Sequence, residues 1–245
     1  MINLLASRSN GRKHNQLRNL EIYSNYNIHA EGSCLITLGN TKLICTASVD
    51  EYLPPFLRNG NSGWLTAEYN MLPRATHTRT KRESTTGKPA GRSIEIQRLI
   101  GRSLRAAIDL KTLGRRQIII DCDVIQADGG TRTAAINGGY VALVLACETL
   151  IRQGQLRAMP KLNPICAISC GIVNGDARLD LDYLEDANAD TDANFVMTAD
   201  GKFIEVQATA ENNNFDWQEL QQMQQLAINA AKEITETQLK VINGS

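Results

Sequence analysis

The 245-residue chain lacks net charge, because 26 Lys and Arg residues balance 26 Asp and Glu residues. No global field therefore draws it to nucleic acid or to a membrane surface. It also lacks an apolar run of about 18 residues, the length of a membrane-spanning helix. The run Leu4, Leu5, Ala6 is too short for the apolar region of a signal peptide. We therefore expect no membrane segment and no secretion signal.

The chain also lacks the cysteine spacing of a metal or redox motif. None of its six cysteines forms a C-x-x-C pair, so zinc-ribbon and thioredoxin-like sites are not indicated. Most of them fall in apolar strand or helix patterns, which predicts buried free thiols and a reducing, cytoplasmic setting. The six are Cys34, Cys45, Cys122, Cys147, Cys166 and Cys170.

Both common glycine-rich nucleotide-binding motifs are missing as well. Gly129 and Gly130 are followed by neither the lysine of a P-loop nor a third glycine at dinucleotide spacing. They separate an alternating strand that ends near Gln126 from a long apolar helix predicted over Ala134–Ile151. Backbone donors at a helix start, with Arg132 beside them, favour an anion or phosphate site. The alternative is an ordinary strand-to-helix turn with a surface arginine.

Other elements follow from periodicity and turn residues. The chain is long enough for one large domain or two small ones, and Pro160 and Pro164 mark the best boundary within it. The predicted elements are strands at 34–38 and 42–49, a helix from Ser93 to Gly114, a strand at 165–173 returning over 177–183, a hairpin of 195–197 with 203–207, and a C-terminal helix that starts at Asp216 with Glu219 as its capping-box partner.

Basic residues are concentrated in one segment. Residues 74–105 hold nine Lys and Arg residues against Glu83 and Glu95. Arg92 stands just before the predicted helix, which places a second guanidinium at a helix start. Exposed arginines separated by threonines suit a surface that meets a polyanion, and the alternative is a solvated loop. The helix stripe of Arg98, Arg102 and Arg105 is equally consistent with a subunit contact.

Acidic residues are concentrated in another segment. Between Glu185 and Asn194 oxygen-bearing side chains recur, which suggests a hard cation. An EF-hand is excluded, because counting from Asp186 its glycine and glutamate positions hold Thr191 and Met197. Mg²⁺ held by one or two carboxylates and a substrate phosphate fits better, although a solvated acidic loop is the alternative. Together, the phosphate turn, basic segment and acids indicate phosphate chemistry on a nucleic acid.

Seven blocks of the sequence, in order and spanning roughly residues 8–238, closely resemble the ribonuclease PH family of phosphate-dependent tRNA nucleotidyltransferases. The resemblance is greatest to the bacterial single-domain enzymes. The blocks are KHNQLR, HAEGSCLITLGNTKLICTASV, GWLTAEYNMLPRATHTR, GRSIEIQRLIGRSLRAAIDLKTLG, DCDVIQADGGTRTA, DLDYLEDANADTDANFVMT and FIEVQATAE.

The resemblance implies a fold and an activity. The fold would be α/β (α+β), with two sheets and packed helices, related to the ribosomal protein S5 domain 2-like superfamily. It would form one domain over 1–245 with subhalves at about 1–160 and 161–245. The activity would be Mg²⁺- or Mn²⁺-assisted phosphorolysis of the 3′ ends of tRNA precursors and other RNA by inorganic phosphate, in a cytoplasmic homohexamer built as a trimer of dimers.

The resemblance also implies site residues. Its acidic pair, Asp186 and Asp192, would hold the metal and act in catalysis, with Asp192 a candidate general acid. The run from Asn137 to Tyr140 departs from the family's usual residues and affects packing, but removes no ligand. Phosphate would be bound by Arg92, Gly130, Thr131 and Arg132, and the RNA 3′ end by Arg74, Arg79 and Arg82.

Two other functions are compatible with parts of the pattern. A catalytically silent RNA-binding ring subunit would be expected to lose an acid or a phosphate-site arginine, whereas Arg92, Arg132, Asp186 and Asp192 are all present. A hydrolytic nuclease would need no phosphate pocket and would release nucleoside monophosphates.

Overall fold

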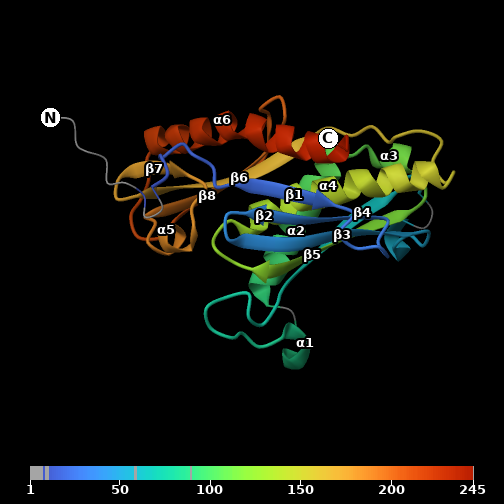
Figure 1. The fold of residues 1–245 in the computed structure, drawn as a ribbon, viewed down its shortest axis with the longest axis horizontal. Helices are drawn as coiled ribbons and strands as arrows, with labels where there is room; N and C mark the ends of the chain where they lie inside the picture. Colours follow the sequence, from blue (N-terminus) through green and yellow to red (C-terminus); the bar gives the residue numbers. More distant parts are fainter. Residues whose placement is uncertain (1–7, 9–10, 58–59, 89, 245) are drawn as a thin grey trace.

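The computed structural model describes residues 8, 11–57, 60–88 and 90–244, so the short apolar run at 4–6 lies outside the described residues. The described chain forms a five-stranded and a four-stranded sheet with helices packed on them (Figure 1). This confirms the predicted α/β class with two sheets.

The five-stranded sheet has the order β1-β2-β3-β5-β4 and is antiparallel except for the β4/β5 pair. Alternation in β5 explains its two faces: Ile118, Ile120 and Cys122 are buried, whereas Asp121 and Asp123 point to the other side. The strands are β1 (Leu20–Ser24), β2 (Gly32–Leu38), β3 (Thr41–Asp50), β4 (Trp64–Met71) and β5 (Gln117–Gln126).

The four-stranded sheet has the order β7-β6-β8-β9 and is antiparallel throughout. Every residue of β6 is buried, as its continuous apolar sequence requires. The strands are β6 (Ile165–Val173), β7 (Asp176–Leu179), β8 (Thr191–Thr198) and β9 (Phe203–Ala210).

One helix joins the two sheets. α4 (Thr131–Arg152) packs against β2 and β3 of the first sheet and against β6 of the second. It is long and apolar enough to pass a test for a membrane-spanning helix, but 83% of its most apolar window is buried inside the protein. A helix that is apolar on all sides is expected at the centre of a fold, and α4 is that central helix.

The remaining helices cover the outside. α2 (Gly91–Ala107) packs on β4 and α4, and α6 (Trp217–Ile242) lies along β6, β7 and β1. Figure 1 shows α6 along one edge of the molecule and α1 extending from the opposite side on a long loop. The short elements are η1 (Pro55–Leu57), α1 (Glu83–Thr86), α3 (Leu110–Leu113) and α5 (Tyr183–Ala187).

Three local predictions need correction. The helix predicted from Ser93 to Gly114 ends at Ala107, because Ile108 is extended and bridges to Leu162 before α3 begins. The return strand predicted over 177–183 stops at Leu179, since Asp182 caps α5. No strand was predicted at 20–24 or at 64–71, where β1 and β4 form the two edges of the first sheet.

The departure between Asn137 and Tyr140 is explained by packing around α4. Asn137 donates its side-chain amide to the Ala167 carbonyl and accepts a hydrogen bond from the Ala167 backbone amide, both at 2.8 Å. It thereby satisfies backbone groups of β6 from the helix. A Cβ atom on Gly138 would lie 2.7 Å from the sulfur of Cys45, so only glycine lets α4 approach β3 this closely.

Candidate active site

The two glycines of the phosphate motif form a left-handed turn, and α4 begins directly after this turn at a cleft. Gly129 and Gly130 have φ values of 76° and 67°, which non-glycine residues adopt at a cost. A Cβ atom on Gly129 would lie 2.4 Å from the Leu181 carbonyl oxygen. Thr131 and Arg132 are the first two residues of α4, where backbone N–H groups lack helical partners. Both glycines are therefore needed to form this anion-binding helix start.

A buried tyrosine holds the first residue of that helix. The Tyr69 hydroxyl donates a hydrogen bond of 2.8 Å to Thr131 Oγ1, and Tyr69 is only 2% exposed. Burial raises the pKa of Tyr69 to about 12, although its contact with Thr131 and the charges of Arg92 and Arg132 act in the opposite direction. The neutral hydroxyl remains a donor, which leaves the Thr131 hydroxyl hydrogen able to bind an anion.

Two arginines reach the same cleft from different helices. Arg92 is the second residue of α2, and Arg132 is the second residue of α4. Among the described residues, the side-chain contacts of Arg132 are long, 3.6 Å to Glu95 and 3.5 Å to Gln207. Within that part of the chain, no tight ion pair holds it. A planar guanidinium in this position can bind phosphate oxygens through paired hydrogen bonds.

The opposite wall carries the acidic pair. Asp186 comes from α5, and Asp192 is the second residue of β8. Burial is the largest cause that raises the pKa of Asp186, while Arg132 and Arg92 lower it. Burial also raises the pKa of Asp192, and the nearby Asp186 carboxylate raises it further. The two carboxylates therefore repel each other in a partly desolvated site that also contains two guanidinium groups.

Glu185 has a different role from its acidic neighbours. Its carboxylate accepts a 2.7 Å hydrogen bond from Arg8 Nε and lies 3.3 Å from Arg178. It also completes the capping box of α5 with Asp182. Glu185 is thus part of a buried ion network that fixes α5, so the acidic segment divides into structural and cleft-facing acids.

One cleft of about 530 Å³ brings the predicted phosphate and acidic residues together. Asn194, from the predicted cation-binding segment, also lines it, together with Glu211 and Ser169, which were assigned no role from the sequence. The predicted residues in its wall are Arg92, Gly130, Thr131, Arg132, Asp186 and Asp192. Arg74, Arg79 and Arg82, the residues predicted to bind RNA, are not among the described residues that line this cleft.

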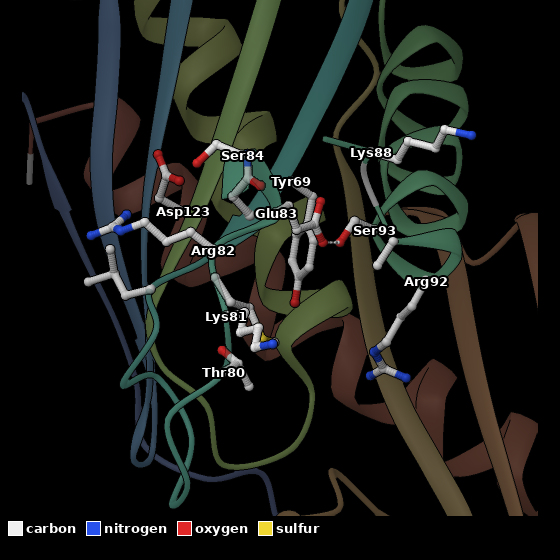
Figure 2. Close-up of a pocket in the computed structure, with 14 residues that line it drawn as sticks. Tyr69, Thr80, Lys81, Arg82, Glu83, Ser84, Lys88, Arg92, Ser93 and Asp123 are labelled. Atoms are coloured by element: carbon white, nitrogen blue, oxygen red, sulfur yellow. Dashed lines mark hydrogen bonds between the residues drawn. The ribbon is translucent and has the colours of Figure 1, made fainter. Parts of the chain in front are cut away.

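A second cavity of about 590 Å³ adjoins the first and shares Arg92 and Met71 with it. Arg82 and Lys81 line this second cavity, whereas Arg74 and Arg79 are exposed on the same basic segment. Figure 2 shows Lys81 and Arg92 extending toward the end of Tyr69 that carries its hydroxyl. The basic segment therefore borders the phosphate site through Arg82.

The acidic wall suits a hard divalent cation that completes its coordination with substrate and water. No group of three or more His, Cys, Asp or Glu side chains with metal-site geometry occurs among the described residues. Mg²⁺ commonly binds proteins through one or two carboxylates together with substrate phosphates. Asp186 and Asp192 match that donor set. A cation beside them would offset the repulsion between their charges.

Two residues that shape the site were not predicted from the sequence. Tyr69 occupies an inward position of β4, in phase with the buried Leu65 and Ala67, and no strand was predicted there. Arg18 was given no role from the sequence, yet it is only 6% exposed and binds Asp180 and the phosphate turn. Its signal was limited to its place in the resembling run KHNQLR.

The sequence of this chain is similar to that of known 3′ exoribonucleases. Models of the 3′ exoribonuclease family match domain 1 over residues 16–147 and domain 2 over residues 163–230. The Ribonuclease PH of Maricaulis maris is 52% identical over 237 residues, which is 97% of this chain and 100% of that protein.

Two solved structures share the fold. An Archaeoglobus fulgidus exosome with RNA bound to the active site gives a TM-score of 0.79 at 22% identity, over 94% of this chain and 92% of that one. Rrp46 from rice (Oryza sativa) gives 0.77 at 19% identity, over 96% and 100%. Taken with the two family matches and the 52% identity, they place the chain in the ribonuclease PH family of 3′ exoribonucleases.

Proposed function

We propose roles for individual residues in the phosphate-dependent 3′–5′ trimming of tRNA ends, the activity that membership of the ribonuclease PH family gives this chain. One observation carries the assignment. Two helix starts, each carrying an arginine, line the same cleft as two carboxylates. Inorganic phosphate and an RNA phosphodiester are both anions that need positive groups for binding. The reaction requires the two anions to be bound at the same place.

The basic wall binds and orients the attacking phosphate. The Gly130 turn, Thr131 and the two arginines Arg92 and Arg132 offer backbone, hydroxyl and guanidinium donors to its oxygens. An oxygen of inorganic phosphate attacks the phosphorus of the last phosphodiester, and the bond to the 3′ oxygen of the shortened RNA breaks. The product is a nucleoside diphosphate whose β-phosphate was the inorganic phosphate. The reverse reaction adds nucleotides from diphosphates, because it exchanges the same two kinds of bond.

Through a bound cation, the acidic residues of the cleft stabilise the negative charge of the reacting groups, and they supply the proton for the leaving group. Asp186 and Asp192 would hold Mg²⁺ or Mn²⁺, and the bound cation would supply positive charge that offsets the negative charge of the reacting phosphates. Asp192, or a water molecule oriented by it, protonates the leaving 3′ oxygen.

The basic segment guides the RNA 3′ end toward the cleft. Arg74, Arg79 and Arg82 are exposed on a loop that extends beyond the body of the protein (Figure 1). Exposed arginines provide sequence-independent contacts with a phosphodiester backbone. We extend the proposal to a cytoplasmic homohexamer, a trimer of dimers in which this loop lies at a subunit boundary. The six buried free cysteines are consistent with a reducing compartment.

Two variants test the separation of phosphate and RNA sites. Arg132→Ala should raise the KM for phosphate at least about tenfold, because a charge-assisted contact is lost, while the Kd for RNA changes less than about twofold. Arg79→Ala should do the reverse. Steady-state phosphorolysis at varied phosphate and a filter-binding assay with 3′-tailed RNA measure the two quantities. Equal losses of both quantities in both variants would contradict the assignment.

A further inference from the structure

A buried arginine connects the two walls of the cleft. Arg18 Nε donates to Asp180 Oδ2 at 2.9 Å, and Arg18 Nη2 donates to Asp180 Oδ1 at 2.7 Å. The Arg18 backbone N–H donates to the same carboxylate at 2.8 Å. Arg18 is 6% exposed and Asp180 is fully buried. Arg18 and Asp180 thus form a paired, charge-assisted contact in the interior, and Asp180 Oδ2 also accepts a hydrogen bond from Arg12 Nη1 at 3.2 Å.

The same guanidinium also donates hydrogen bonds to backbone carbonyls of the phosphate turn. Arg18 donates to the carbonyl oxygens of Asp128 and Gly129, and to that of Leu181 on the acidic side. A Cβ atom on Gly130 would lie 3.1 Å from Arg18 Nη2, so the guanidinium lies directly against the turn. Arg18 therefore touches both the backbone that presents phosphate donors and the backbone that leads into α5.

Asp180 is held in a conformation that carries strain. Its φ of 53° lies in the left-handed region, which an aspartate adopts only where surrounding contacts enforce it. Its backbone N–H donates to the Ser169 carbonyl at 2.7 Å, and its own carbonyl accepts from Arg8 at 2.8 Å. The strained residue lies two positions before Asp182, the N-cap of α5, which carries Asp186.

We propose that Arg18 and Asp180 are positioning residues that set the distance between bound phosphate and the catalytic carboxylates. The inference rests on the proposed function and deepens it, since neither residue is among the described residues that line the cleft. In-line attack depends on this distance, and displacement by about 1 Å can lower a rate by about a hundredfold. Arg18 is the group that bonds to both the turn at 128–129 and the segment at 180–181.

Arg18→Lys is the first test, because it keeps the charge and removes the paired geometry. We expect the KM for phosphate to rise about tenfold and kcat to fall about tenfold, while the Kd for RNA changes less than about twofold. The matched control is Arg8→Lys. The hydrogen bonds that Arg8 makes with described residues go to the N-terminal segment at 13–16 and to the acidic side at 179–185, and none of them goes to the phosphate turn. It should lower the thermal midpoint comparably and leave the phosphate KM within about twofold.

The phosphate readout separates positioning from simple stability. If Arg8→Lys and Arg18→Lys raise the phosphate KM equally, or if neither does, the positioning role is wrong. Should Arg18→Lys fail to fold, Asp180→Asn is measured instead, with the same expected rise in phosphate KM and the same overturning result.

Calorimetric titration of each folded variant with inorganic phosphate alone distinguishes this inference from the reaction. If the wild-type protein binds phosphate but releases no diphosphate, the proposed function is contradicted and the positioning role of Arg18 and Asp180 is not. If Asp180→Asn binds phosphate with unchanged affinity, the positioning role is wrong even when the wild type is fully active.

Discussion

At the residue scale, the hydroxyl of one buried tyrosine contacts a residue of the proposed phosphate site. Tyr69 and Tyr140 are both buried, and burial raises the pKa of each to about 12. The Tyr69 hydroxyl donates to Thr131 at the start of α4, whereas Tyr140 lies within the body of that helix. The two tyrosines therefore form a matched pair for asking whether Thr131 must be held in place.

We predict that Tyr69→Phe raises the phosphate KM roughly fivefold, because loss of one neutral hydrogen bond is equivalent to about 1 kcal/mol. Tyr140→Phe should leave the phosphate KM unchanged. Steady-state kinetics at saturating RNA measure both variants. A phosphate KM in Tyr69→Phe that equals that of Tyr140→Phe would show that Thr131 needs no support from the hydroxyl.

A second residue-scale prediction concerns the acidic wall. Asp192→Asn should lower kcat by about a hundredfold or more while the protein stays folded and keeps its oligomeric state, because the amide can neither carry the charge nor donate a carboxyl proton. Asp200→Asn is the control, since Asp200 is exposed in the turn between β8 and β9. Single-turnover trimming of a 3′-tailed RNA measures the rate, and near-normal turnover removes Asp192 from the mechanism.

At the element scale, the start of α4 depends on a glycine for two separate reasons. Gly129 has φ of 76°, and a Cβ atom there would meet the Leu181 carbonyl at 2.4 Å. Gly175, in the turn between β6 and β7, has φ of 79°, and a Cβ atom there would have no other described residue within 4 Å beyond its chain neighbours. Substitution of Gly175 tests the effect of backbone strain alone. Substitution of Gly129 adds the loss of the close contact between the phosphate turn and the segment leading to α5.

Gly175→Ala should lower the free energy of unfolding by about 1 kcal/mol and leave activity unchanged, because only a left-handed alanine is introduced. Gly129→Ala should cost more stability and raise the phosphate KM, since the turn must move away from Leu181. Urea unfolding and phosphate-dependent kinetics provide the two readouts. If Gly129→Ala and Gly175→Ala lose the same stability and both keep normal activity, the contact between the turn and Leu181 is not needed for stability or for activity.

Elements whose pattern is local were predictable from the sequence. The alternation of β5 and the continuous apolar pattern of α4 located both elements to within a few residues. The capping box of Asp216 and Glu219 at the start of α6 is present as predicted. β1 was missed because its five residues form a sheet edge covered by α6 and carry little alternation.

The candidate site was predictable only where its residues form a motif. The glycine turn and the acidic segment were recognisable from composition, and both reach the same cleft. Arg18 could not be recognised, because its partner Asp180 is 162 positions away along the chain. Glu185 was placed with the cation-binding acids, since the sequence does not show that Arg8 and Arg178 surround it.

At the scale of the whole molecule, the buried residues form one large cluster around α4 and the first sheet and a second cluster between the second sheet and α6, and these two clusters contain the thiols. All six cysteines are free and buried. Burial raises the pKa of Cys147 and that of Cys166 from 9.0 to about 12. A thiol with such a pKa is almost entirely neutral near pH 8, so it reacts poorly as a nucleophile.

We therefore predict that a thiol-reactive dye labels the native protein slowly at pH 8 and labels it fully in urea. Stability should also fall as the pH rises from about 9 toward 12, because the thiols of the unfolded chain lose their protons first. Mass spectrometry counts the labels, and circular dichroism follows unfolding against pH. Rapid stoichiometric labelling of folded protein would contradict the burial of these side chains.

The central claim is that the cleft uses inorganic phosphate as the attacking group. The most direct measurement supplies radiolabelled inorganic phosphate, Mg²⁺ and a 3′-tailed RNA to the purified protein and identifies the nucleotide released. The account predicts nucleoside diphosphate with one label, in its β-phosphate, for each nucleotide removed, and no release when phosphate is omitted. Unlabelled nucleoside monophosphate formed without phosphate would show hydrolysis by water, and RNA that is bound without any release would indicate a silent ring subunit.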